Sequence, residues 1–177
     1  MPTTRPAIDN PMLNRKELGS SKPSTSQEPV SAAAREFPQI TVRNLQRSAA
    51  VDVVELEKFA AEAVRRCLRL RRHKPTQLAK LREIFVLLIS DRRMAALHRQ
   101  FLNQSGPTDV LTFEHGEIFI SVQTARRHAR AFRNSLTREL QLYIVHGLLH
   151  LHGFDDRKQA SARKMERTQE KILRCAL

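Results

Sequence analysis

We expect an α+β (mixed α/β) fold, in which a mixed sheet of about four strands is packed by about five helices. Short apolar segments typical of strands occur between longer segments whose apolar residues recur at helical intervals. The two kinds of segment interleave without strict alternation, which predicts a mixed rather than a regularly alternating domain. The sequence contains no internal repeat.

Residues 1–37 are predicted to form a disordered N-terminal extension, and residues 38–177 the folded domain. The extension has few apolar residues to bury and many serines among its prolines, which are Pro2, Pro6, Pro11, Pro23 and Pro29. The domain should begin near Gln39, where Ile40-Thr-Val42 alternates in the manner of a strand.

The first half of the domain is predicted to contain a long helix between two strands. Apolar residues recur at helical intervals over Val51–Leu70, and arginines gather where this helix ends. That basic cluster could bind RNA phosphates or simply match the negative end of the helix dipole. Glu83–Ser90 is almost uninterruptedly apolar, which predicts a central strand buried on both faces. Asp91 is expected to cap the next helix, which continues to about Asn103.

The second half is predicted to hold a hairpin followed by three helices. Pro107–Phe113 and Glu117–Ser121 flank the turn residues His115 and Gly116, a pattern typical of two paired strands. The helices are expected to span about 122–132, from a break near 134–135 to 152, and 157–175.

The chain is strongly basic, with 31 Lys and Arg against 18 Asp and Glu, a net charge of +13 and an isoelectric point near 11.0. Residues 1–40 hold five basic and four acidic residues, so the rest holds 26 against 14, or about +12. A domain this basic indicates a polyanionic partner such as RNA or DNA, unless the arginines only keep the fold soluble. Trp is absent and Tyr143 is the single tyrosine, so phosphate contacts rather than base stacking should dominate.

The two cysteines, Cys67 and Cys175, do not make a disulfide framework and lack the spacing of a zinc knuckle. We therefore expect a reducing, cytoplasmic location. No run of about 18 apolar residues occurs, so no membrane span is predicted.

The segment from His146 to Asp156 has the spacing of metal ligands and lies near the C-terminal end of the chain. His146 and His150 are four residues apart, so both imidazoles project from one face of an α-helix. Gly153 can take the left-handed conformation that ends a helix, after which Asp156 can approach the imidazoles. Two nitrogens and one oxygen leave a fourth position for water, as in a catalytic zinc site. We therefore expect a metal site on this C-terminal helix.

Other interpretations of this segment stay open. A histidine pair at this spacing also occurs on surfaces and in cores without a metal. His152 lies about 200° round the helix from His150 and should face away, while spacing alone does not separate Asp155 from Asp156. Zinc proteases with two helical histidines place a glutamate directly after the first, where this chain has Gly147. A metalloprotease is therefore a less favoured alternative.

Three segments of the domain carry motifs of one known family. The metal segment is similar to His-Gly-x-Leu-His-Leu-x-Gly-Tyr-Asp-His, Pro107–Phe113 to Pro-Thr-Asp-Val-Leu-Ser-Phe, and Gly116–Ile120 to Gly-Asp-Ile-x-Ile. From about residue 39 to 176 the chain thus resembles the YbeY family of bacterial endoribonucleases, the rRNA maturation factors. The N-terminal extension has no counterpart in this resemblance.

The resemblance implies a single-strand-specific, zinc-dependent endoribonuclease acting in 16S rRNA 3′-end maturation and ribosome biogenesis. It implies one zinc ion per chain, with Asp156 standing where most members have a third histidine. It also implies an rRNA precursor and the small ribosomal subunit as partners, with ribosome-associated proteins. Members carry a Tyr-Arg pair before the Pro-Thr-Asp segment, where this chain has Phe101 and Leu102. Because leucine lacks the donors of that arginine, a non-catalytic ribosome-assembly factor is a second alternative.

Further residues are candidates for the reaction itself, in which zinc would lower the pKa of bound water toward about 7. Asp109 is a candidate general base, although an acid before a strand is also a common turn or capping residue. His115, near the hairpin turn, is a candidate proton carrier. The helix before the metal helix carries arginines that could bind RNA phosphates or form a solvated face: Arg126, Arg127, Arg130 and Arg133.

Overall fold

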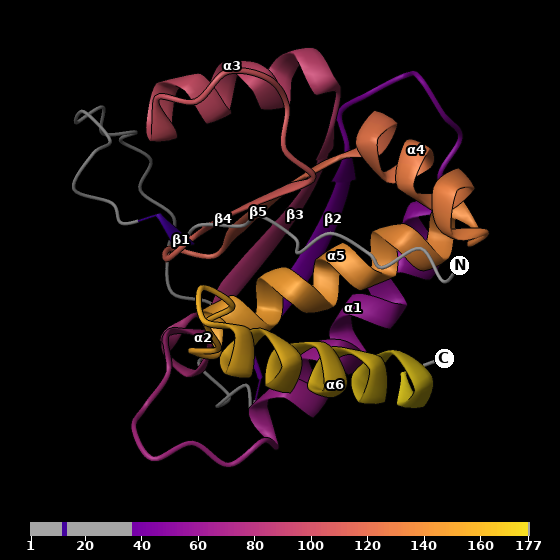
Figure 1. Cartoon of the computed structure of the whole chain (residues 1–177). Coiled ribbons are helices and arrows are strands. Elements are labelled where there is room, and N and C mark those ends of the chain that lie inside the picture. Colours follow the sequence, from indigo (N-terminus) through magenta and orange to yellow (C-terminus); the bar gives the residue numbers. More distant parts are fainter. Residues whose placement is uncertain (1–11, 14–36, 177) are drawn as a thin grey trace, which may run out of the picture.

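The computed structural model describes residues 12–13 and 37–176, which contain five strands and six helices (Figure 1). The strands are β1 (Met12–Leu13), β2 (Gln39–Asn44), β3 (Glu83–Ile89), β4 (Val110–Phe113) and β5 (Glu117–Ser121). The helices are α1 (Val53–Leu68), α2 (Gln77–Lys80), α3 (Asp91–Leu102), α4 (Val122–Phe132), α5 (Leu136–Leu151) and α6 (Gln159–Cys175).

The strands form one mixed sheet in the order β1-β4-β5-β3-β2. β3 pairs in parallel with β2 on one side and with β5 on the other, whereas β4 and β5 form the predicted antiparallel hairpin. The predicted α+β class with four main strands is confirmed. The two-residue β1 is an addition: it falls within the expected N-terminal extension and pairs in parallel with Thr112 and Phe113 of β4. The other residues of that extension lie outside the described part of the chain.

The sheet lies between α3 on one side and α1, α5 and α6 on the other (Figure 1), and it separates a large core from a small one. Val86 of β3 and Ile118 of β5 face the large core, which α1, α5 and α6 complete. Leu87 and Phe119, on the opposite face, pack in the smaller cluster under α3. β3 is therefore a central strand as expected, but burial on both faces is only partial, because Phe85 and Leu87 on the α3 side stay half-buried.

Two local expectations are corrected by the structure. The short helix α2 was not predicted, so the described residues contain six helices rather than about five. Asp91 does not cap α3; the Ser90 hydroxyl does, by accepting a hydrogen bond from the Arg93 amide at 3.3 Å. The Asp91 carboxylate instead joins α3 to α4, because it accepts hydrogen bonds from three side chains at the start of α4: Ser121, Thr124 and Arg127.

Helix α5 is the central helix of the fold and is buried on every side from Glu139 to Leu151. Its start is capped by Ser135, whose hydroxyl accepts from the Arg138 amide at 3.1 Å. A Cβ at Gly147 would lie 2.9 Å from a methyl carbon of Ile118, so glycine lets α5 approach β4 and β5 closely. Although α5 is largely apolar, no helix in the described residues is long and apolar enough to cross a membrane.

Candidate metal centre

Helix α5 and the turn after it bring the three predicted metal ligands together. The Nε2 atoms of His146 and His150 are 3.0 Å apart. Asp156 Oδ2 lies 3.6 Å from the first of these nitrogens and 3.7 Å from the second. Among the described residues, these three side chains form a group of His and Asp donors whose arrangement could hold a metal ion.

The spacing of these atoms fits a small divalent cation. Sides of 3.0, 3.6 and 3.7 Å define a triangle whose equidistant point lies about 2.0 Å from each corner. Zinc binds imidazole nitrogen at about 2.0–2.1 Å and carboxylate oxygen at about 2.0–2.2 Å. Both imidazoles are about 5% exposed and the Asp156 side chain 17% exposed, so the donors face each other in a largely dry setting.

The outer nitrogens of the two imidazoles have partners that orient the inner ones. His150 Nδ1 lies 3.2 Å from the carbonyl oxygen of Phe154, and His146 Nδ1 lies 3.1 Å from Gln169 Oε1. A carbonyl oxygen only accepts, so a hydrogen on each Nδ1 satisfies these two contacts and leaves the lone pair of each Nε2 directed toward Asp156. Two lone pairs 3.0 Å apart repel unless a cation or a proton lies between them. This arrangement is typical of a metal site.

The structure also distinguishes the two candidate carboxylates. Burial raises the pKa of Asp156, but the interaction with His150 and the attraction of His146 outweigh it, so the pKa lies below its usual value. Asp155 instead pairs with Arg157 at 2.9 Å, and that hydrogen bonding lowers the pKa of Asp155 to about 2. Asp156 is therefore the carboxylate available to a metal.

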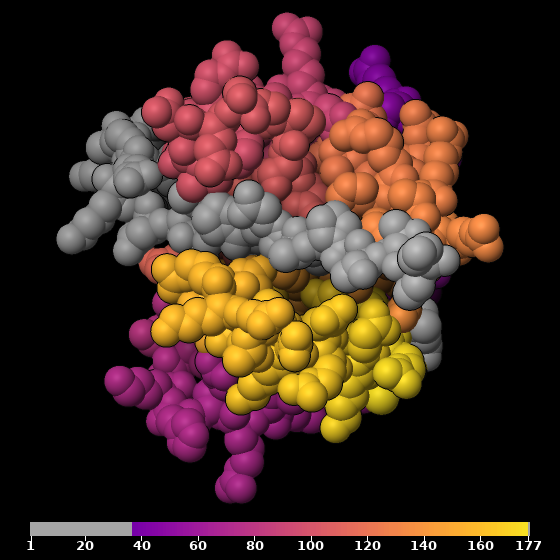
Figure 2. Space-filling model, viewed as in Figure 1, coloured from indigo at the N-terminus to yellow at the C-terminus, as the bar shows by residue number. Residues whose placement is uncertain are grey.

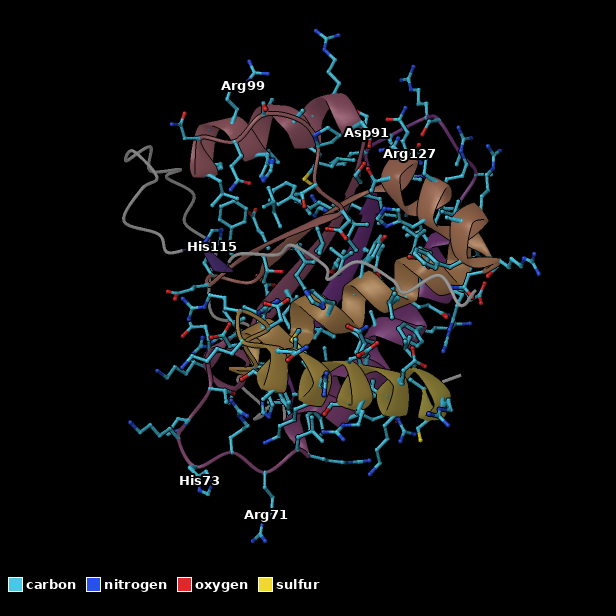
Figure 3. All side chains as sticks on the ribbon, viewed as in Figure 1. Arg71, His73, Asp91, Arg99, His115 and Arg127 are labelled. Carbon is cyan, nitrogen blue, oxygen red and sulfur yellow. The ribbon has the colours of Figure 1, made fainter. Side chains whose placement is uncertain are left out.

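The two acid–base candidates occupy opposite ends of β4. Asp109 is buried just before the strand, where its carboxylate accepts from the Val110 amide at 2.9 Å. His115 is in the turn after the strand, 3.1 Å from Glu117, at the hairpin end (Figure 3). The length of β4 puts them on the order of 15 Å apart, so a single metal centre cannot use both directly.

The four candidate arginines lie on or directly after α4, at the N-terminal end of α5. Arg126 donates to the Ser48 carbonyl oxygen at 3.2 Å, and Arg127 pairs with Asp91 at 2.6 Å (Figure 3). Arg130 is exposed, and Arg133 ends the helix in a left-handed conformation. The rise of α5 from its first residue to His150 is roughly 20 Å, so these arginines are remote from the metal ligands.

The positions of the expected Tyr-Arg pair are occupied by side chains of the smaller core. The Phe101 ring packs edge-on against Phe113, with ring centres 5.1 Å apart, and Leu102 is half-buried in the same cluster. The neighbouring Arg99 is exposed on α3 and points away from the sheet (Figure 3). It does not replace the missing arginine.

Two groups that complete the site were not identified from the sequence. Gln169 lies on the buried face of α6 between Met165 and Ile172, and a polar residue on an apolar helix face was a signal of this role. The Phe154 carbonyl gave no signal, because its contact depends on how the turn after α5 folds. Figure 2 shows α6 and the turn that precedes it beside the segment that follows α1, on the lower part of this face.

Comparison with known proteins agrees with this fold. The sequence model of the family described as Endoribonuclease YbeY matches residues 41–176. An Endoribonuclease YbeY of Anaeromyxobacter sp. is 39% identical over 120 residues, which cover 60% of this chain and 62% of that protein, under two thirds of its length. One from Thermus thermophilus is 39% identical over 102 residues, covering 51% of this chain and 73% of the relative.

A solved structure also resembles this fold. A solution structure from Thermotoga maritima has a TM-score of 0.55 and 26% identity, and it covers 77% of this chain and 88% of its own. The match of the family model extends over most of the folded domain, including both histidines and Asp156. The chain belongs to the Endoribonuclease YbeY family.

Proposed function

We propose that the chain is a metal-dependent endoribonuclease that cleaves single-stranded regions of rRNA precursors, in 16S rRNA 3′-end maturation and ribosome biogenesis. The observation that carries the proposal is the donor triangle of His146, His150 and Asp156, whose dimensions suit one zinc ion. The name of the relatives, Endoribonuclease YbeY, supports RNA as the substrate and phosphodiester hydrolysis as the reaction. Two free cysteines support a reducing location such as the cytoplasm.

The side chains around the triangle have separable roles in this proposal. His146, His150 and Asp156 would hold the zinc, and a bound zinc would supply Lewis-acid chemistry, which lowers the pKa of a bound water molecule and polarises a phosphoryl oxygen. Gln169 and the Phe154 carbonyl keep the two rings turned so that Nε2 faces inward.

In this proposal the proton carrier is Asp109 or His115, which flank β4 and can be tested one at a time because they are far apart. His115 can take up or release a proton beside Glu117, while Asp109 is already held by the amide at the start of the strand. Replacing the true carrier, as Asp109→Asn or His115→Gln, should lower kcat by about 10²–10⁴-fold with zinc still bound.

The exposed arginines of α4 would contact RNA phosphates away from the reacting bond. Arg126 and Arg130 are one helical turn apart and both exposed, so a strand could contact them together. Arg127 and Arg133 are also exposed, although Arg127 pairs with Asp91. Each lost phosphate contact should reduce, by about one, the slope of the logarithm of the RNA-binding constant against the logarithm of the salt concentration.

The direct experiment compares cleavage of a purified rRNA precursor by the wild-type protein and by His146→Ala, with zinc content measured on both. We expect the variant to lose both zinc and cleavage. His73→Ala is the matched control, because His73 is an exposed histidine whose side chain points outward from the fold (Figure 3), and this variant should keep both. Equal cleavage by wild type and His146→Ala, after removal of contaminating nucleases, would contradict the proposal.

One observation favours a second function, that of a non-catalytic ribosome-assembly factor. Leu102 packs in the core under α3 where the family carries an RNA-contacting arginine, so one contact near the bond to be cut is missing. Binding to small ribosomal subunits without cleavage of the precursor would decide for this function. Peptide hydrolysis is disfavoured, because the tight contact of Gly147 with Ile118 leaves no space for a catalytic glutamate.

A further inference from the structure

The turn that carries the third metal ligand is short and tightly defined. α5 ends through two hydrogen bonds, from the Gly153 amide to the His150 carbonyl at 2.8 Å and from the Phe154 amide to the Leu149 carbonyl at 2.9 Å. Gly153 has a φ of +80°, the left-handed conformation that this type of helix end requires. Only two residues separate Gly153 from Asp156. The orientation of Phe154 therefore decides where the Asp156 carboxylate lies.

Phe154 contributes to the metal centre in a second way. Its carbonyl oxygen accepts the hydrogen bond from His150 Nδ1 at 3.2 Å. A displacement of Phe154 would thus release the orientation of one imidazole and shift the carboxylate at the same time. Two of the three ligands depend on this single residue.

A residue from a distant part of the sequence holds Phe154 in place. The Arg72 guanidinium donates a hydrogen bond to the Gly153 carbonyl, 81 residues away in sequence. Its central carbon also lies over the Phe154 ring, 4.6 Å from the ring centre. A planar cation stacked on an aromatic face fixes the plane of that ring as well as its position. The guanidinium of Arg72 therefore contacts both the backbone of the turn, at Gly153, and a side chain of the turn, that of Phe154.

The segment that follows α1 also contacts the turn through His152. His152 lies with Nδ1 3.1 Å from the Thr76 hydroxyl and Nε2 3.1 Å from the Leu70 carbonyl. Its ring is stacked on that of Phe154, with ring centres 6.4 Å apart. His152 faces away from the metal ligands, as expected from the sequence. The rings of His152 and Phe154 and the guanidinium of Arg72 form one packed group.

We propose that Arg72 is a positioning residue of the metal centre, which it supports by holding Gly153 and Phe154. The proposal rests on the proposed function only in that it requires the triangle to bind a metal. It also explains why an arginine of the basic segment after α1 turns back toward the fold. The neighbouring Arg71 and His73 point outward from that segment (Figure 3).

The test measures zinc affinity by competition with a chelating dye, for the whole protein and its variants. Arg72→Ala should bind zinc about tenfold or more weakly, since loss of a residue that orients metal ligands costs about 10–100-fold in affinity. Arg71→Ala is the matched control, because it removes the same charge from the same segment without touching the turn, and it should bind zinc like the wild type. Circular dichroism establishes that each variant is folded.

A spectroscopic measurement separates positioning from general stability. The visible spectrum of bound cobalt(II) reports the number and arrangement of its ligands, and it does not follow changes in unfolding free energy. In Arg72→Ala this spectrum should move toward that of Asp156→Ala, whereas Arg71→Ala should keep the wild-type spectrum. Phe154→Leu, which keeps the apolar volume but removes the aromatic face, should shift the spectrum in the same direction.

The outcomes distinguish this inference from the proposed function. Wild-type zinc affinity and an unchanged cobalt spectrum in folded Arg72→Ala would overturn the role of Arg72 and leave the metal centre intact. If Arg72→Ala does not fold, the same two measurements on Phe154→Leu decide, and wild-type values there refute the proposal. A wild-type protein that binds neither zinc nor cobalt would contradict the proposed function and, with it, this inference.

Discussion

Replacement of Gly147 by alanine tests the close contact between α5 and the sheet. An added Cβ would lie 2.9 and 3.0 Å from two carbons of Ile118 and 3.0 Å from the Thr112 hydroxyl oxygen. These distances are shorter than ordinary van der Waals contacts of about 3.5–4.0 Å, so the helix or the strands must move apart by a few tenths of an ångström. Because His146 precedes this residue, the displacement should also reach the metal centre.

Two opposing effects set the magnitude of this change. Overpacking of a buried position costs about 1–3 kcal/mol. Alanine in place of glycine inside a helix contributes about 1 kcal/mol in the other direction. We therefore expect Gly147→Ala to lower the free energy of unfolding by about 1 kcal/mol, equivalent to about 2–4 °C in Tm for a chain of this size.

The assay is chemical and thermal denaturation followed by circular dichroism, with Ala96→Gly as the control. Ala96 is exposed in the middle of α3, so this control measures the helix preference of alanine over glycine in the same protein, about 1 kcal/mol. If Gly147→Ala is instead more stable than the wild type by a similar amount, the close contact with Ile118 does not exist.

Three further predictions concern the site, the helix junction and the cysteines. Gln169→Leu should weaken zinc binding about 10–100-fold in a folded protein, because His146 Nδ1 loses its acceptor; wild-type affinity in dye competition would remove Gln169 from the site. Burial raises the pKa of Asp91, but the hydrogen bonds it accepts outweigh this and hold the pKa below 3.8, so its contribution to stability is present above about pH 4 and lost below it. Urea denaturation at pH 6 and pH 3 should therefore show a smaller acid-induced loss in Asp91→Asn than in the wild type, and equal losses would contradict this role. Burial raises the pKa of Cys67 to about 12, so a thiol reagent should rapidly modify one cysteine, the exposed Cys175, in the native protein and two in denaturant.

Periodic patterns in the sequence predicted the elements that depend on local chemistry. The helical spacing of the two histidines and the apolar run of β3 correctly placed α5 and the central strand, because burial imposes a repeat on long elements. The four residues of α2 are too few to carry such a repeat. The cap of α3 was assigned to Asp91 rather than Ser90, since both are common caps and only the tertiary contacts of Asp91 decide between them.

Local spacing along a helix also made the metal centre predictable in part. Spacing along one helix identified His146 and His150, but only the folded turn distinguishes Asp156 from Asp155, through the ion pair of the latter with Arg157. The groups that orient the ligands come from distant parts of the sequence. Gln169 belongs to another helix and Arg72 to a segment 81 residues before Gly153, so no local pattern connects them to the site.

The central claim is that His146, His150 and Asp156 bind one metal ion, and X-ray absorption of the zinc-loaded protein tests it most directly. The account predicts one zinc per chain, with two imidazole nitrogens and a carboxylate oxygen at about 2.0–2.2 Å. In Asp156→Ala the carboxylate contribution should disappear while both imidazoles remain. Zinc bound to sulfur at about 2.3 Å, or a wild-type spectrum unchanged in Asp156→Ala, would contradict the claim.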